Sequence, residues 1–486
     1  MKLSRIIADI DPLEIKGDPE IEVSNIVNDS RDAGDGDLFI CITGFNTDGH
    51  KYIDQAYSRG TRIFVIEREI ENYRTDCTYI FVKDSRKAMG YIASAFYNYP
   101  LRELKLIGVT GTNGKTTTTF LIKSILEHVG NRVGLIGTIE VQVPGNSYPS
   151  TRTTPESLEL YHYFREMVDR GVTHVVMEVS SHALDLNRVA GMEFDASVFT
   201  NISRDHLDYH ESIKDYLRAK CRLFEIVKPE GYGIVNLDDK YSEEVCDSTR
   251  GDILTYGITG DADFRSVNIS VGPEGASFCL NGKDFCVDLN LTGRFNVYNA
   301  LASIAVSRSL GVNYGDIRDG LEGIKGVPGR FELIKEGQNF SVVVDYAHTP
   351  DGMKNVLDTA RNLAKNRVIV VFGCGGDRDR SKRSVMGRLG AELADYSIIT
   401  SDNPRSEDEE DIIAQIERGI EEMSEPGTYD VFIDRREAIF RAVEEAREGD
   451  MVLIIGKGHE TYQVFKDKTI HFDDREVARE ALRERG

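Results

Sequence analysis

A glycine-rich turn between an apolar stretch and a helical pattern is the segment of this chain best suited to hold phosphate. It reads Gly-Val-Thr-Gly-Thr-Asn-Gly-Lys-Thr-Thr-Thr-Thr over residues 108–119. Such a turn leaves backbone N–H groups free for phosphate oxygens, and the following helix adds the positive end of its dipole. Lys115 is placed to reach the outer phosphates, and the Thr116 hydroxyl to ligate Mg²⁺. We expect a nucleoside triphosphate to be bound by Gly111, Thr112, Asn113, Gly114, Lys115, Thr116 and Thr117.

The spacing of this turn departs from the usual P-loop. That pattern has a glycine five positions before Gly114, where this chain has Val109. A glycine-rich turn can also be a purely structural connection between a strand and a helix. The Gly-Lys-Thr ending, followed by three more threonines at a helix start, favours phosphate binding over that alternative.

Two further polar segments follow apolar strands in the same part of the chain. Glu178 ends one of them, and its carboxylate oxygens suit Mg²⁺, whereas the alternative is a buried glutamate neutralised by a neighbour. His206 and His210 lie four residues apart, which on a helix permits a zinc pair. No third and fourth ligands follow at the usual spacing, so a structural zinc site is rejected. His206 is expected near the triphosphate and His210 at the surface.

Residues after the strands of the last third of the chain carry arginines. The segments Asp377-Arg378-Asp379-Arg380 and Asp402-Asn403-Pro404-Arg405 both follow apolar runs. Arginine forks suit carboxylate recognition, although a lone surface ion pair is the alternative for each. Two arginines in one region of an acidic chain favour anion recognition. Cys374, in a glycine turn with no base beside it, is interpreted as a small residue filling the turn.

Composition limits the classes of function. The 486 residues carry a formal net charge of −22, which argues against binding to nucleic acid or to anionic membranes. No apolar run reaches the roughly 18 residues of a membrane span, and the first residues lack a signal-peptide pattern. Seven cysteines without a C-x-x-C pair indicate reduced thiols and a cytoplasmic protein.

Alternation of strand and helix patterns predicts an α/β chain of three domains, over residues 1–99, 100–327 and 328–486. Apolar strands are expected at 37–42, 62–66 and 79–82, then at 173–179, 196–201 and 233–237, and finally at 342–344, 368–372, 397–400, 431–434 and 451–455. Residues 251–292 read as a small antiparallel addition. Ligand sites of open parallel sheets lie beyond the carboxyl ends of the strands, so the polar segments above should share such edges.

Four of the segments together resemble the Mur ligase family, in its tripeptide-forming branch. They read Gly-Thr-Asn-Gly-Lys-Thr-Thr, Met-Glu-Val-Ser-Ser-His, Asn-Ile-Ser-Arg-Asp-His-Leu-Asp-Tyr-His and Asp-Tyr-Ala-His-Thr-Pro-Asp. The resemblance covers essentially the whole chain and includes the unusual phosphate turn. It implies a UDP-binding N-terminal domain, a central P-loop-type ATPase domain with a parallel sheet, and a Rossmann-like C-terminal domain that brings the amino acid. It also implies a cytoplasmic monomer.

The reaction implied by the resemblance is ATP-dependent amide formation. ATP phosphorylates the D-Glu γ-carboxylate of UDP-MurNAc-L-Ala-D-Glu, and the amine of an amino acid then displaces phosphate. Two Mg²⁺ ions and Lys115 neutralise the anionic reacting groups, and Thr116, Glu178 and His206 lie at the metals. Lys220 alone reads as a solvated helix lysine, but the resemblance makes it a carbamylated N6-carboxylysine that helps hold Mg²⁺. Lys115, Lys220 and His206 are thus the expected catalytic residues.

The remaining site residues are also carried over from the resemblance. It implies nucleotide contacts by Asn299, Arg330, Asp345 and His348. It implies uridine contacts by Ser30, Asn46 and His50, and muramoyl-peptide contacts by Thr153, Thr154, Ser180 and Arg188. Relatives with Gln before this arginine differ from the present chain, which has Leu186.

The amino acid added is expected to be meso-diaminopimelate. Its distal carboxylate and amine would be held by Arg378, Asp402, Asn403, Arg405, Gly456 and Glu460. L-Lysine has no distal carboxylate to satisfy an arginine fork, yet lysine-adding relatives with a similar arginine keep that alternative open. A MurF-like, folylpolyglutamate or pseudomurein peptide ligase is a second alternative, and a nucleotide-hydrolysing switch that joins nothing is a third.

Overall fold

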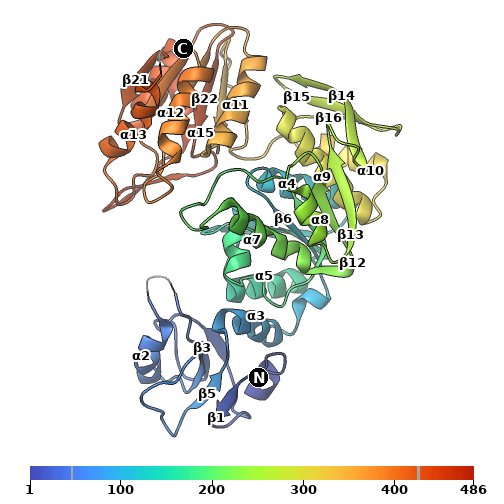
Figure 1. The fold of residues 1–486 in the computed structure, drawn as a ribbon, viewed down its shortest axis with the longest axis vertical. Helices are drawn as coiled ribbons and strands as arrows, with labels where there is room; N and C mark the ends of the chain where they lie inside the picture. The colour runs from blue at the N-terminus through green and yellow to red at the C-terminus, as the bar shows by residue number, and fades with distance from the viewer. Residues whose placement is uncertain (45–46, 424–426, 486) are drawn as a thin grey trace.

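The computed structural model describes residues 1–44, 47–423 and 427–485 and arranges them as three sheet-based units along its longest axis (Figure 1). The N-terminal unit lies at the bottom of the view, the central unit in the middle and the C-terminal unit at the top. Every strand predicted from the sequence overlaps a strand of the structure. The exact domain limits at 99 and 327 stay a prediction.

The N-terminal unit is built on a five-stranded sheet of order β1-β5-β4-β3-β2. All neighbours are parallel except β1 and β5. Its strands are β1 Glu14–Lys16, β2 Asn25–Val27, β3 Asp37–Ile40, β4 Ile63–Ile66 and β5 Thr78–Phe81. Helix α3 (Ser85–Phe96) connects this unit to the central one, where it contacts α5 (Ser157–Asp169).

The central unit contains an eleven-stranded sheet of order β16-β15-β14-β13-β12-β11-β6-β10-β7-β8-β9. Its parallel middle consists of β7 Val133–Ile136, β10 His174–Glu178, β6 Lys105–Thr110, β11 Phe194–Phe199, β12 Val227–Asn236 and β13 Asp252–Gly257. These strands are rich in buried Val, Ile and Leu, as expected for a parallel sheet covered on both faces. Helices α4 (Lys115–His128) and α9 (Arg294–Ser309) pack together on one face.

The region 251–292 extends the central sheet and is not a separate addition. β13 and β14 (Phe264–Gly272) pair in parallel, and only β15 (Gly275–Leu280) and β16 (Cys286–Leu289) complete an antiparallel edge. Its register places Cys279 opposite Cys286, and the two form a disulfide. The prediction that all cysteines are reduced is therefore wrong for this pair, because residues seven apart become direct neighbours across a hairpin.

The C-terminal unit has a six-stranded sheet of order β17-β18-β22-β19-β20-β21, parallel except for the edge strand β17. The strands are β17 Glu332–Ile334, β18 Ser341–Asp345, β19 Val368–Phe372, β20 Tyr396–Thr400, β21 Tyr429–Phe432 and β22 Met451–Ile455. Separate apolar cores cover its two faces. One includes α11 (Pro350–Leu363), α12 (Lys382–Leu393) and α13 (Glu409–Glu421), and the other α14 (Arg435–Glu445) and α15 (Asp474–Arg485).

A small hairpin of β23 (Tyr462–Val464) and β24 (Thr469–His471) lies beyond the end of β22. Because parallel strands end at a common edge, the loops after β18, β19, β20 and β22 are neighbours there. Among the described residues, no helix is both long and apolar enough to cross a membrane.

Candidate active site

The glycines of the phosphate turn have no room for a side chain. The turn joins β6 to α4, and Gly111 has φ +150°, with a Cβ there falling 1.8 Å from Thr200 Oγ1. Gly114 has φ +88°, and its Cβ would lie 2.4 Å from Asn299 Oδ1. This left-handed conformation is one that glycine adopts without cost. The turn is thus held tightly between the end of β11 and α9.

Two lysines converge on one backbone carbonyl of this turn. Lys115 Nζ donates to the carbonyl oxygens of Gly111 and Thr112, both at 2.9 Å. Lys220, from α7 (Ile213–Glu225), donates to the same Gly111 oxygen at 2.8 Å. The interpretation of Lys220 as a solvated lysine is wrong, because only 1% of it is exposed.

The surroundings of both ammonium groups favour their neutral forms. Burial lowers the pKa of Lys115. Burial and, next, the charge of Lys115 lower the pKa of Lys220 well below 10.5. Lys220 therefore gives up its proton more readily than a surface lysine, and a neutral amine is a nucleophile.

Glu178, at the end of β10, is buried beside this turn and satisfied by one threonine. Its Oε1 accepts the Thr138 backbone N–H at 2.8 Å, and its Oε2 accepts the Thr138 hydroxyl at 2.9 Å. Thr138 was not singled out in the sequence, although it directly follows β7, the neighbour of β10. Its place after an adjacent parallel strand was the signal that could have found it.

The histidines after β11 lie in a loop, packed against the helix that carries Lys220. His206 has φ +55° and its ring centroid is 4.8 Å from that of His182. Burial lowers the pKa of His206, so its ring is neutral near pH 7, the form that ligates metals. His210 is 5% exposed and its Nε2 is 2.9 Å from Ser181 Oγ, so the prediction of a surface histidine is wrong.

The donor set suits Mg²⁺ that is bound together with phosphate. Among residues 1–44, 47–423 and 427–485, no group of three or more His, Cys, Asp and Glu side chains could hold a metal ion alone. Mg²⁺ commonly takes one or two carboxylates and completes its shell with water and substrate phosphates. Thr116 at the start of α4 and Glu178 at the neighbouring strand end supply oxygen donors of this kind, and the charge of Glu178 acts on the adjacent Lys115.

The C-terminal unit touches the phosphate turn directly. Arg330 Nη2 donates to Thr116 Oγ1 at 2.8 Å, and Asn113 Nδ2 donates to Asp351 Oδ2 at 3.0 Å. Asp345 is occupied by the backbone, since it accepts N–H groups of Phe331 and Ala347, both at 2.7 Å. The two sheets thus present their strand ends to each other.

His348 and Asn299 complete the predicted nucleotide contacts. His348 Nδ1 lies 2.9 Å from the Tyr346 carbonyl oxygen, and its own carbonyl accepts Lys382 Nζ at 2.8 Å. Asn299 is buried beneath Gly114, and its Nδ2 donates to Asn296 Oδ1 at 2.9 Å. The structure brings these residues to the interface of the phosphate turn with the C-terminal unit.

The predicted muramoyl-peptide residues form one connected group next to Glu178. Thr154 Oγ1 donates to the Glu178 carbonyl at 2.9 Å and accepts the Ser180 N–H at 3.0 Å. Arg188 Nη1 donates to the Thr154 carbonyl at 3.0 Å. Thr153 Oγ1 accepts the Thr138 hydroxyl at 3.1 Å. The loop 151–156 is therefore tied to the same strand end as Glu178.

The predicted uridine-binding residues lie in the N-terminal unit, away from this group (Figure 1). Ser30 is buried and donates to Gln55 Oε1 at 2.9 Å. His50 bridges Asp48, 2.6 Å from its Nδ1, and the Glu67 N–H, which donates to its Nε2 at 3.0 Å. Asn46 lies outside the described residues.

Two of the predicted amino-acid contacts, Arg378 and Arg405, lie side by side across Gly375. A Cβ on Gly375 would be 2.9 Å from Arg405 Nη1 and 3.8 Å from Arg378 Cγ. Arg405 has φ +53°, and its Nη1 donates to the Gly376 carbonyl at 2.7 Å. Its backbone N–H donates to the Val464 carbonyl at 3.0 Å, so the β23–β24 hairpin fixes its position.

The other predicted contacts lie close to Arg405, whose Nη1 is 3.5 Å from the Asn403 carbonyl oxygen. Asp402, Asn403 and Gly456 are buried, and Asp402 Oδ2 would lie 2.6 Å from a Cβ on Gly456. Asn403 Nδ2 donates to Glu460 Oε2 at 2.8 Å. Cys374 nearby is also buried, and burial raises the pKa of its thiol to about 11, in keeping with a space-filling role.

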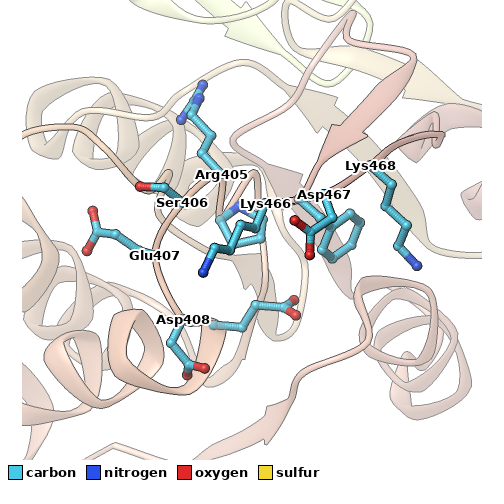
Figure 2. Close-up of a pocket in the computed structure, with 10 residues that line it drawn as sticks. Arg405, Ser406, Glu407, Asp408, Lys466, Asp467 and Lys468 are labelled. Carbon is cyan, nitrogen blue, oxygen red and sulfur yellow. The ribbon is translucent and has the colours of Figure 1, made fainter.

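A hollow of about 410 Å³ opens beside Arg405. Figure 2 shows Ser406, Glu407 and Asp408 on one side of it, and Lys466, Asp467 and Lys468 of the hairpin on the other. Arg405 points away from these residues in the view. The hollow therefore borders the predicted amino-acid contacts, with Arg405 in its lining.

Three family models match successive parts of the chain. They are the Mur ligase family catalytic domain over residues 22–97, the Mur ligase middle domain over 109–307, and the Mur ligase glutamate ligase domain over 329–458. The chain belongs to the Mur ligase family.

Curated relatives give a narrower likeness. The chain is 46% identical to a UDP-N-acetylmuramoyl-L-alanyl-D-glutamate--2,6-diaminopimelate ligase of Clostridium botulinum, covering 100% of both chains. It is 47% identical to the ligase of that name from Caldanaerobacter subterraneus, covering 97% of each. A solved structure of a ligase of the same name has a TM-score of 0.71 at 33% identity, covering 100% of this chain and 99% of the other.

Solved structures of two alternative ligases match the chain at low identity. MurF of Acinetobacter baumannii has a TM-score of 0.66 at 22% identity, over 93% of this chain and 95% of the other. A pseudomurein peptide ligase of Methanothermus fervidus has 0.59 at 18%, over 93% and 95%. These likenesses are in the fold alone.

Proposed function

We propose that this chain joins meso-diaminopimelate to the D-Glu γ-carboxylate of UDP-MurNAc-L-Ala-D-Glu, with cleavage of ATP to ADP and phosphate, in peptidoglycan precursor synthesis. The γ-carboxylate takes the terminal phosphoryl group of ATP to form an acyl phosphate. The amine of the amino acid then attacks the acyl carbon, and phosphate leaves from the tetrahedral intermediate. The relatives described above carry the name of this activity over full-length matches.

The phosphate turn and Lys115 bind and orient the triphosphate in this proposal. The N–H groups of the turn and the start of α4 face the phosphates, and Lys115 leaves its two carbonyl partners to neutralise the transferred phosphoryl group. Thr116, Glu178 and His206 would hold Mg²⁺, which supplies further neutralisation of the phosphates when bound. Thr153, Thr154, Ser180 and Arg188 position the muramoyl peptide beside Glu178.

Lys220 is proposed to carry a carbamate. Its buried ammonium gives up a proton readily, and the neutral amine can then add to CO₂ and release a second proton, which leaves a carbamate anion with two oxygens. That anion would face the Lys115 ammonium across the Gly111 carbonyl that both now share. The exchange replaces repulsion between two lysines by attraction, and it adds oxygen donors near Thr116 and Glu178.

The amino acid is bound by the strand ends of the C-terminal sheet. Arg405 and Arg378 bind its distal carboxylate, whereas Glu460 and Asn403 face its distal amine. One observation carries this assignment: Arg378 and Arg405 both adjoin Gly375, and Arg405 lies next to Asn403, whose amide donates to the Glu460 carboxylate.

Phosphate release tests the proposal. Purified protein is given ATP, Mg²⁺ and UDP-MurNAc-L-Ala-D-Glu with meso-diaminopimelate, with L-lysine or with no amino acid. We expect strong stimulation by diaminopimelate alone. Stimulation by lysine would reject the assignment of the arginines, and release that ignores both the sugar nucleotide and the amino acids would reject the ligase itself.

A further inference from the structure

A lysine that none of the assignments above uses is buried at the centre of the amino-acid contacts. Lys457, in the loop between β22 and β23, is 0% exposed. Its Nζ lies 3.1 Å from Glu460 Oε2 and 3.1 Å from Asn403 Oδ1. A charge in such a place is retained only where partners satisfy it, since burial of an unpaired ammonium is costly. Its two partners are both proposed contacts of the distal amine.

Lys457 fixes which way the Asn403 amide points. Asn403 Oδ1 accepts from Lys457 Nζ and also from the Val464 backbone N–H at 3.0 Å. Both groups can only donate, so the oxygen must face them and the amide nitrogen must face Glu460, to which it donates at 2.8 Å. Without Lys457, a single backbone donor would hold the amide oxygen.

Lys457 lies between two carboxylates of the amino-acid contacts. Asp402 and Glu460 are carboxylates, and Lys457 supplies one positive charge between them. Arg435 and Asp474 beside them form a buried pair that neutralises itself, with Nε–Oδ1 and Nη2–Oδ2 distances of 2.8 and 2.7 Å. The charge of Arg405 also acts on Asp402, so Lys457 and Arg405 together offset the two carboxylates.

We propose that Lys457 is a positioning residue for the distal amine of the incoming diamino acid. It holds Glu460 and Asn403 in the orientation that accepts this amine, and it reduces the repulsion between Asp402 and Glu460 so that both stay close. Lys457 itself touches no reacting atom. The inference rests on the proposed function, because it assumes that the amino acid carries a distal amine.

A comparison of two amino acids tests this role. 2-Aminopimelate keeps both carboxylates and one amine but lacks the distal amine, so it gains nothing from Glu460. The kcat/KM for each amino acid is measured for the wild type, K457M, K457Q and the control K365M. Lys365 is an exposed lysine at the opposite edge of the same sheet.

We expect K457M to lose about 10- to 100-fold in kcat/KM for meso-diaminopimelate, mainly through KM, as for removal of a hydrogen bond to a charged group. The loss for 2-aminopimelate should be threefold or less. K457Q, which keeps an N–H donor but no charge, should fall between K457M and the wild type. K365M should match the wild type. Equal losses of kcat/KM with both amino acids would overturn the positioning role. A KM for ATP that rises as much as the KM for diaminopimelate would overturn it as well.

The double variant K457M/E460Q covers the case in which K457M does not fold. It removes both charges together and should be as soluble as the wild type, with the two amino acids used almost equally. A retained wild-type preference for diaminopimelate in this variant or in K457Q would also overturn the inference. Failure of the wild type to use diaminopimelate would reject the proposed function instead, so the two failures are distinguishable.

Discussion

The two strand-end clusters that face each other in this molecule hold their charges in opposite ways. In the central unit, Lys115 and Lys220 are bonded to backbone carbonyls, and among the described residues neither forms an ion pair. In the C-terminal unit, the buried Arg435 and Lys457 have carboxylate partners, Asp474 and Glu460. The described part of the central cluster thus leaves both lysines without a direct carboxylate partner, whereas Arg435 and Lys457 each have one.

This difference indicates what each cluster receives. Cations that rest on carbonyls are available to a highly charged anion, which replaces weak partners by strong ones. A paired network has little net charge to offer, and its selectivity comes from fixed donors and acceptors that match a zwitterion. Removal of a single charge should therefore disable the central cluster, whereas in the C-terminal cluster it should weaken one substrate only.

Lys115 tests the first half of this comparison and should show the largest effect. K115A removes the cation nearest the transferred phosphoryl group, so we expect kcat to fall by at least about 10³-fold. The measurement is phosphate release with all substrates saturating. K123A, which removes a half-buried lysine of the same helix that pairs with Glu127, is the control. Normal turnover by K115A would reject the assignment of the triphosphate site.

Substitution of Lys220 distinguishes a carbamate at this position from an unmodified lysine. K220A should lose about 10²- to 10³-fold in kcat if an anionic group is missing beside the phosphates. Short carboxylates such as acetate or formate should restore part of the activity, because they can occupy the space of the carbamate. K214A, at an exposed position of the same helix, should be unaffected. Absence of rescue, together with no mass increase of the intact protein under CO₂, would refute the carbamate.

Much of both clusters could be predicted from strand ends. An apolar run followed by polar residues marked Glu178 after β10 and the segment 402–405 after β20, and the structure places them at sheet edges as expected. This works because the carboxyl ends of parallel strands share an edge whatever the details of packing. Thr138 and Lys457 obey the same rule, because each lies two residues beyond the end of a parallel strand, β7 and β22.

The features that the sequence did not predict depend on contacts between distant segments. His210 is buried because it packs against Ser181, and Cys279 pairs with Cys286 because of strand register. Lys220 is different, because its neighbours at helical spacing, Tyr216 and Phe224, are buried on the same face. A lysine within an apolar helical stripe was a readable signal of a buried, functional group.

Arg405 tests the second half of the comparison. R405A removes one half of the arginine pair but leaves the network beneath it, so we expect the KM for diaminopimelate to rise about 10- to 50-fold. The KM for ATP should change less than twofold, and R405K should recover only part of the loss because it cannot form a fork. R388A, in an exposed ion pair on α12, serves as the control. Equal changes in both KM values would refute selective recognition by Arg405.

Substitution of Glu407 should have the smallest effect of these changes, because Glu407 acts on Arg405 only through the loops that its hydrogen bonds connect. Its carboxylate accepts both Nη groups of the buried Arg383, at 2.9 and 3.0 Å, and the Asp377 N–H at 2.7 Å. The Arg383 bonds lower the pKa of Glu407 to about 2, against burial, which raises it. The folded pKa lies below the unfolded value near 4.5, so this stabilisation is present above pH 4.5 and is lost as pH falls toward 2.

The stability difference between the wild type and E407Q should therefore shrink by about 1 to 2 kcal/mol between pH 7 and pH 3.5. Urea unfolding followed by circular dichroism measures it, with E410Q, an exposed glutamate in the first turn of the helix that follows Glu407, as the control. A stability difference that is independent of pH would mean that the charge of the Glu407 carboxylate does not stabilise these loops. In that case the arginine pair would be positioned by the backbone bonds of Arg405 alone, and the paired network would matter less for selectivity than the comparison implies.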